Sequence, residues 1–225
     1  MKTLIATLFA GALFVTPATA STVIDFDALD ASATQPVPLL TFSEDGFTFS
    51  LSSTGANSGP AIFDTTVSDA DANGDTELTP PFLPGSNGFI EGNIIILQDN
   101  TGAVPDDDAS GGTITLTLES GPAFFLENVS AIDDGFFEVF TITGGGPAAL
   151  FGSVDLDEVG GLPETGLITG TSTLISVGDS IVFDFNSFSG GFDSVTVTAV
   201  PLPAPVAMLL AAIGGLFVMA RRRRA

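Results

Sequence analysis

The sequence predicts an all-β protein, a single jelly-roll-like β-sandwich of about eight to ten strands. Several stretches alternate apolar and polar residues with a period of two, which is typical of half-buried strands. Clusters of Gly, Pro, Asn, Asp and Ser separate these stretches, as turns and loops require. No part of residues 21–199 shows the 3.6-residue period of a helix. We therefore expect one acidic β-sandwich domain over residues 21–199.

The expected strands follow from the pattern in order. The alternating stretches include residues 23–26, 46–51, 113–118, 137–143, 180–185 and 194–198. Residues 94–97 form a continuous apolar run and predict a central strand buried on both faces. Loops are expected at residues 54–60, 79–88, 101–112, 144–147 and 187–191. Because Trp and Tyr are absent, the 20 Phe residues are expected to supply most of the large core side chains.

The charges are segregated along the chain, whose net charge is −22. All 27 acidic residues lie between Asp25 and Asp193, and no Lys, Arg or His occurs from Ser21 to Leu202. Such a segment cannot neutralise phosphates, so nucleic acid is excluded as a partner. It also lacks Cys and Tyr. The usual general bases and covalent nucleophiles are therefore missing, and we expect no enzymatic activity.

The first 20 residues read as a secretory signal peptide. Lys2 provides a positive start, residues 4–15 are apolar, and Pro17 breaks the helix before Ala18-Thr19-Ala20. This small-x-small sequence predicts cleavage after Ala20. The protein is therefore expected to be exported.

The last 26 residues read as a membrane anchor. Residues 200–220 carry no charge and would reach about 30 Å as a helix. We predict a transmembrane helix at 205–220, with its firmest part at 206–220 because prolines precede it. A stop-transfer cluster that stays in the cytoplasm follows, formed by Arg221, Arg222, Arg223 and Arg224.

A short motif precedes this helix, formed by Val200, Pro201, Leu202, Pro203 and Ala204. Together, the motif, helix and arginine cluster resemble the VPLPA variant of the PEP-CTERM class of bacterial sorting signals. The resemblance implies a Gram-negative bacterium and an exosortase-type peptidase that cuts near the motif. The ectodomain would then pass from the inner membrane to the cell surface or extracellular matrix. The literal PEP is absent, which leaves the processing enzyme open, and an uncut single-span anchor is the alternative.

One acidic stretch fits the first half of a calcium loop. Its candidate ligands follow the pattern D-x-[DN]-x-[DN]-G, in which alternate oxygen ligands converge on a hard cation; they are Asp69, Asp71, Asn73, Asp75 and Glu77. Gly74 permits the sharp bend, but Pro80 stands where an EF-hand has its bidentate Glu. We therefore expect weak calcium binding completed by distant ligands, with a solvated acidic loop as the alternative. For the adjacent carboxylates Asp106, Asp107 and Asp108, a solvated loop is favoured.

A second possible calcium site combines Asp25 and Asp27 with Asp193, which precedes the predicted last strand. The patterns IDFDAL and GFDSVTVT around these residues resemble jelly-roll carbohydrate-binding and discoidin-like modules. The resemblance implies that a structural calcium can sit near the chain ends. Residues 63–65, the run GNIIILQ and the run PDDDASGGTITLTL also look like other exported PEP-CTERM-type β-proteins.

Three functions remain in order of preference. The first is an exported surface or matrix structural protein, stabilised by calcium, because divalent cations would relieve the repulsion between its carboxylates. The second is a calcium-dependent module that binds carbohydrate such as exopolysaccharide, although it lacks the Trp and Tyr that usually stack on sugars. The third is a polysaccharide hydrolase that uses two carboxylates, but no spacing nominates a pair.

Overall fold

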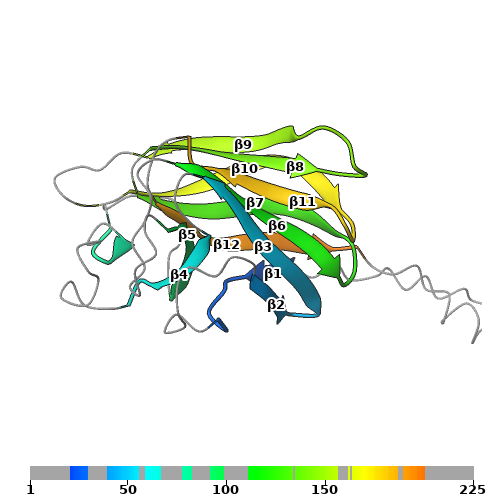
Figure 1. Cartoon of the computed structure of the whole chain (residues 1–225), viewed down its shortest axis with the longest axis horizontal. Coiled ribbons are helices and arrows are strands. Elements are labelled where there is room, and N and C mark those ends of the chain that lie inside the picture. Colours follow the sequence, from blue (N-terminus) through cyan, green and yellow to red (C-terminus); the bar gives the residue numbers. More distant parts are fainter. Residues whose placement is uncertain are drawn as a thin grey trace, which may run out of the picture.

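The computed structural model describes residues 21–29, 40–55, 59–66, 78–82, 92–98, 111–133, 135–156, 162, 164–186 and 190–200. Within these ranges, the chain forms two six-stranded sheets that pack as a β-sandwich (Figure 1). The prediction of an all-β sandwich is confirmed, and its twelve strands exceed the predicted eight to ten. The predicted signal peptide, transmembrane helix and arginine cluster lie outside the described residues.

Every strand pair in both sheets is antiparallel. The first sheet contains, in spatial order, β10 (Glu164–Ile175), β7 (Phe124–Asp133), β12 (Gly191–Ala199), β5 (Asn93–Leu97) and β4 (Pro60–Asp64), and β1 (Ser21–Ile24) also pairs with β12. The second sheet contains β2 (Leu40–Glu44), β3 (Phe47–Gly55), β6 (Gly112–Ser120), β11 (Ser180–Asp184), β8 (Gly135–Ile142) and β9 (Ala149–Leu156).

Strand β5 is buried on both of its faces, as its unbroken apolar sequence predicts. It lies between β12 and β4. Ile95 belongs to the main core between the sheets, whereas Ile94 and Ile96 belong to a second apolar cluster. That cluster also contains Leu78, with Phe82 packed against it. Residues 78–82 therefore help to cover this part of the first sheet.

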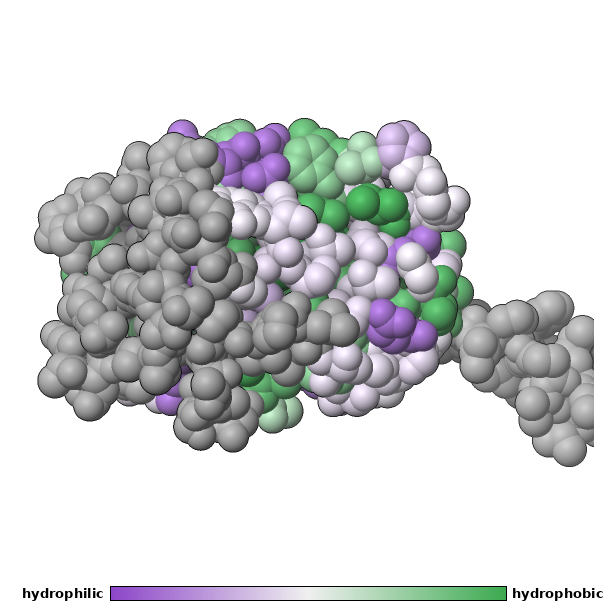
Figure 2. All heavy atoms as spheres, in the orientation of Figure 1, coloured by the Kyte–Doolittle hydropathy of each residue, from purple (hydrophilic) through white to green (hydrophobic). Residues whose placement is uncertain are grey.

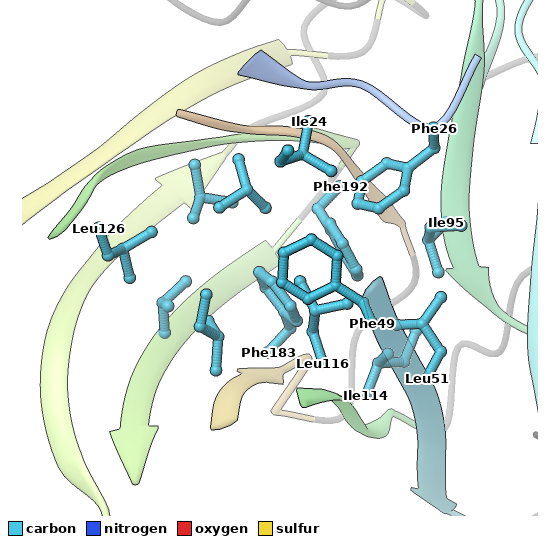
Figure 3. Packing of buried hydrophobic residues seen from close by; sticks show 14 of the residues in the cluster. Ile24, Phe26, Phe49, Leu51, Ile95, Ile114, Leu116, Leu126, Phe183 and Phe192 are labelled. Atoms are coloured by element: carbon cyan, nitrogen blue, oxygen red, sulfur yellow. The ribbon is translucent and has the colours of Figure 1, made fainter. Parts of the chain in front are cut away.

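Ten of the 28 buried residues that the structure describes in the main core are phenylalanine, and most of the others are Ile, Leu or Val. The largest fully buried side chains are phenylalanines, as the composition predicts. Phe183 of β11 stacks on Phe192 of β12 with ring centroids 3.7 Å apart, so this pair joins the two sheets (Figure 3). Phe124 of β7 makes edge contacts with Phe47 and Phe49 of β3 at 5.4 and 6.2 Å. Edge contacts such as those of Phe124 are a favoured geometry of aromatic pairs.

Strands β9 and β10 close one side of the sandwich, where glycine permits a close approach. A Cβ atom on Gly170 would overlap the carbonyl oxygen of Phe151. A Cβ atom on Gly152 would lie 2.8 Å from the carbonyl oxygen of Thr169. Only residues without a side chain fit at these two positions.

Both ends of the described fold meet at one end of the sandwich. Ser21 of β1 pairs with Thr198 near the end of β12, and Val200 donates a backbone hydrogen bond to Ala123 at 2.8 Å. We call this the exit end; its four connections are residues 45–46, 121–123, 143–148 and 176–179. In Figure 1, β6, β10 and β12 all run toward it, on the right of the view.

Candidate functional site

The candidate calcium loop lies outside the described residues. This applies to Asp69, Asp71, Asn73, Asp75 and Glu77, and to the acidic run Asp106, Asp107 and Asp108. Their assignment as calcium ligands or as solvated carboxylates therefore stays a prediction.

The structure describes the N-terminal pair of candidate ligands, Asp25 and Asp27, directly after β1. Between them, Phe26 adopts a positive φ of 62°, which is uncommon for a bulky residue. Its ring is fully buried and makes edge contacts with Phe42 and Phe192, both at 5.5 Å. The buried ring therefore fixes the position of the backbone between the two aspartates.

Hydrogen bonds from backbone N–H groups hold both of these carboxylates in place. The backbone N–H of Asp27 donates to Oδ1 of Asp25 at 3.2 Å. Oδ1 of Asp27 accepts a hydrogen bond from the backbone N–H of Asn93 at 2.9 Å, and Nδ2 of Asn93 donates to the carbonyl of Leu29 at 2.9 Å. The segment after β1 is thereby fastened to the start of β5.

Glu44 at the end of β2 joins this group, and the sequence did not indicate it. Its Oε1 atom accepts a hydrogen bond from the backbone N–H of Asp25 at 3.2 Å. Its Oε2 atom is buried and has no hydrogen-bond partner among the described residues. Burial raises the pKa of Glu44 to about 7, and the nearby charge of Asp25 adds to the rise. Glu44 therefore holds a proton over much of the acidic range.

The structure does not assemble the second predicted calcium site. Asp193 lies inside β12 rather than before it and is buried, with 2% of its surface exposed. Asp25 and Asp27 instead form hydrogen bonds with Glu44, Asn93 and each other. Within the described ranges, no three Asp or Glu residues gather in a way that could hold a metal ion. The prediction of a site formed by Asp25, Asp27 and Asp193 is corrected accordingly.

The outer face of the second sheet is lined by hydroxyl groups. Cross-strand pairs of hydroxyls lie within hydrogen-bond distance: Ser43 and Thr48 at 2.9 Å, Thr54 and Thr113 at 2.5 Å, and Thr117 and Ser180 at 2.9 Å. Figure 2 shows the surface over β3 and β6 in pale colours, which mark residues of intermediate hydropathy such as Ser and Thr.

The character of this face changes beyond β11. On β8, Phe136 is 37% exposed, and Phe140 is half-buried and pairs with Val182. The outer face of the second sheet thus presents hydroxyl groups on β3 and β6 and aromatic rings on β8, with the carboxylates of Asp184 and Glu138 between them.

None of the elements that the structure describes is a helix long and apolar enough to cross a membrane.

No protein-family model matches the chain, and no curated protein is similar to it in sequence. Among solved structures, it is similar to a GH26-CBM35 β-(1,4)-mannanase of Podospora anserina, with 14% identity over 65% of this chain, 29% of that chain and a TM-score of 0.31. It is also similar to an exo-β-1,3-galactanase from Phanerochaete chrysosporium, with 15% identity over 72% of this chain, 30% of that chain and a TM-score of 0.28. The chain therefore covers less than a third of each protein. These similarities do not extend to function, because β-sandwiches support many unrelated activities.

Proposed function

We propose that the chain is an exported structural protein of the cell surface or extracellular matrix, anchored by its C-terminal segment and without enzymatic activity. The observation that carries this proposal is the pairing of Ser21 with Thr198. Ser21 is the first residue after the predicted signal peptide, and Thr198 lies two residues before the predicted sorting motif. The segments that would deliver the protein are therefore joined to the same end of the sandwich, as suits a domain held at a membrane from one end.

Processing at the motif would leave the sandwich intact. The motif begins at Val200, whose N–H makes the last hydrogen bond of the described chain. A cut within residues 201–204 removes no residue of β12 or of any other described strand. This supports a sorting peptidase of the exosortase type as the partner.

Calcium is proposed as the stabilising cation. The predicted ectodomain carries 27 carboxylates and no basic residue from Ser21 to Leu202, so it cannot form internal salt bridges between side chains. Divalent ions from the medium would reduce the repulsion between its carboxylates. The predicted ligands remain those of the loop at residues 69–77.

Fractionation of the native organism tests the proposed function. We expect a processed form without the C-terminal segment in the surface or matrix fraction, detected by antibodies against the sandwich and against the tail. In a variant with Pro201→Ala and Pro203→Ala, the unprocessed chain should accumulate in the inner membrane. The matched control, Pro122→Ala in the connection before β7, should be processed normally. A chain found only in the cytoplasm would overturn the proposal.

A second candidate function, carbohydrate binding, is favoured by the outer face of the second sheet. This face carries hydroxyl groups on β3 and β6 and an exposed phenylalanine on β8, with Asp184 and Glu138 between them. The ring can stack on a sugar while hydroxyl and carboxylate groups exchange hydrogen bonds with it. A glycan array with and without calcium tests this function. Binding that is lost with Phe136→Ser but kept with Phe125→Ser, which changes the other sheet, would support it. Equal binding by both variants and the unchanged protein would place any glycan elsewhere.

A further inference from the structure

Exposed large hydrophobic side chains gather at the exit end. Seven such residues are exposed within the described ranges. Five of them belong to strands or connections at the exit end, with exposed fractions of 38–58%; they are Val23, Phe125, Leu150, Leu174 and Val177. We call these five residues the apolar rim. Hydrophobic residues also reach the surface at this end of the face seen in Figure 2.

Three of the rim residues lie on neighbouring strands of the first sheet. Leu174 of β10 pairs with Phe125 of β7, and Phe125 pairs with Thr198 of β12. Thr198 in turn pairs with Ser21 of β1. This row of four residues crosses the sheet without a charged side chain. Val23 lies two residues farther along β1.

The connections at the exit end carry few charges. They contain two carboxylates, Asp45 and Asp179. Asp179 is buried, and its two oxygens accept hydrogen bonds from the backbone N–H groups of Gly144 at 2.6 Å and Ser176 at 2.9 Å. Asp45 is therefore the only exposed carboxylate in these four connections. The strand ends beside these connections add Glu44, which is half-buried, and Glu119, which is exposed. This end therefore carries few of the 27 acidic residues of the segment.

The chain leaves the sandwich beside this rim. The backbone N–H of Val200 donates a hydrogen bond to the carbonyl of Ala123, and Ala123 lies two residues before the rim residue Phe125. The predicted membrane helix is firmest from residue 206, so five residues separate it from Val200. Five extended residues reach at most about 18 Å. An anchored sandwich must therefore hold its exit end close to the bilayer.

We propose that the apolar rim rests in the lipid interface of the membrane that the C-terminal segment enters. The inference relies on the anchoring in the proposed function. Exposed apolar clusters mark protein or membrane contacts, and apolar side chains that reach the headgroup boundary are stabilised there. The short tether brings lipid to the rim, and the scarcity of charge keeps the cost of desolvating carboxylates small. The remainder of the acidic domain faces the medium.

The test uses two leucines of β10 as a matched pair. Leu174 belongs to the rim, whereas Leu167 is 40% exposed on the same strand, seven residues away, or about 23 Å. The chain contains no cysteine, so Leu174→Cys and Leu167→Cys each provide one labelling site. The full chain is reconstituted in phosphatidylcholine vesicles, and each site carries a fluorophore that nitroxide groups on lipid headgroups can quench.

We expect strong quenching at position 174 and little at position 167. Equal quenching at both positions, in chains that float with the vesicles, would overturn the rim proposal while the anchoring stands. Failure of the full chain to float with the vesicles would contradict the anchoring itself. Disulfide-linked dimers of Leu174→Cys without lipid would identify a second copy of the chain as the occupant and would also overturn the proposal. In the supporting case, Phe125→Ser should reduce the quenching at position 174.

Discussion

The two ends of the sandwich are built differently. At the exit end, four short connections of two to six residues join the strands, and every one contains glycine. At the opposite end, residue 134 joins β7 to β8 and residues 185–190 join β11 to β12, but longer connections are also present: residues 98–111 join β5 to β6 and residues 157–163 join β9 to β10. These longer connections carry acidic clusters, among them Asp106, Asp107, Asp108, Asp157 and Glu158. The exit end thus has only short connections with few charges, whereas acidic clusters occur in the longer connections of the other end.

This difference separates two roles that one acidic domain must combine. Cations are expected to act on the long acidic connections, where repulsion between carboxylates is concentrated. Contact with a membrane is expected at the exit end, where few charges must be desolvated. Each of the following experiments changes one end and uses the other as its reference.

The largest effect is expected from the buried neighbour of a rim residue. Phe124 is fully buried against Phe47 and Phe49, so Phe124→Ala should lower the free energy of unfolding by about 3–5 kcal/mol. Phe125→Ser should change it by about 0.5 kcal/mol or less, because the ring is partly in water. Urea denaturation measures both variants. A comparable loss in Phe125→Ser would mean that the rim is part of the core rather than a contact surface.

The next effect concerns the carboxylate that joins two connections at the exit end. Asp179 accepts hydrogen bonds from Gly144 and Ser176, and removing a buried acceptor leaves its donors unsatisfied. Asp179→Ala should therefore cost about 1–3 kcal/mol in the free energy of unfolding. Asp184→Asn at the other end of β11 provides the reference and should cost less. Equal losses in the two variants would remove the argument that Asp179 holds the exit end together.

Calcium should stabilise the protein through the predicted loop at residues 69–77, which is not part of the exit end. With a dissociation constant of about 10⁻⁴ M, 1 mM calcium would stabilise the folded chain by about 1.4 kcal/mol. Thermal melting in calcium and in chelator measures this effect. Asp71→Asn should abolish it, whereas Asp45→Asn at the exit end should leave it unchanged. A melting temperature that does not respond to calcium contradicts the predicted site at residues 69–77.

The sequence predicted most of the fold where its pattern is regular. Alternation marks β3, β6, β8 and β11 because one face of each strand packs on the core while the other meets water. Strand β10 was not singled out, since its register shifts between Thr169 and Thr173, and such an irregularity interrupts a two-residue period. In the same way, a shift between Phe192 and Val195 obscured the start of β12, so that Asp193 was placed before the strand.

The carboxyl pair of Glu44 and Asp25 could not be predicted from the sequence. The two residues are 19 positions apart; Asp25 follows β1 of the first sheet, Glu44 ends β2 of the second sheet, and no motif relates them. They meet because Phe26 packs against Phe42, a contact between sheets that exists only after folding. Spacing rules describe ligands within one turn or strand, so they nominated Asp25 and Asp27 but missed Glu44.

The smallest predicted effect belongs to Glu44, beside the first turn of the exit end. Burial raises its folded pKa from 4.5 to about 7, so its contribution to stability is present at low pH and is lost as the pH rises to about 7. Glu44→Gln cannot ionise and keeps an oxygen for the N–H of Asp25. The free energy of unfolding of the variant should match that of the unchanged protein near pH 4 and exceed it at pH 8. The expected gain is on the order of 1 kcal/mol, because solvent screens a half-buried group.

Urea denaturation across this pH range measures the difference. Asp155→Asn, an exposed change on β9, controls for the loss of one negative charge. If both variants gain equally at pH 8, net repulsion of the acidic domain explains the gain. If Glu44→Gln alone gains, the cost arises from desolvation where Glu44 meets Asp25.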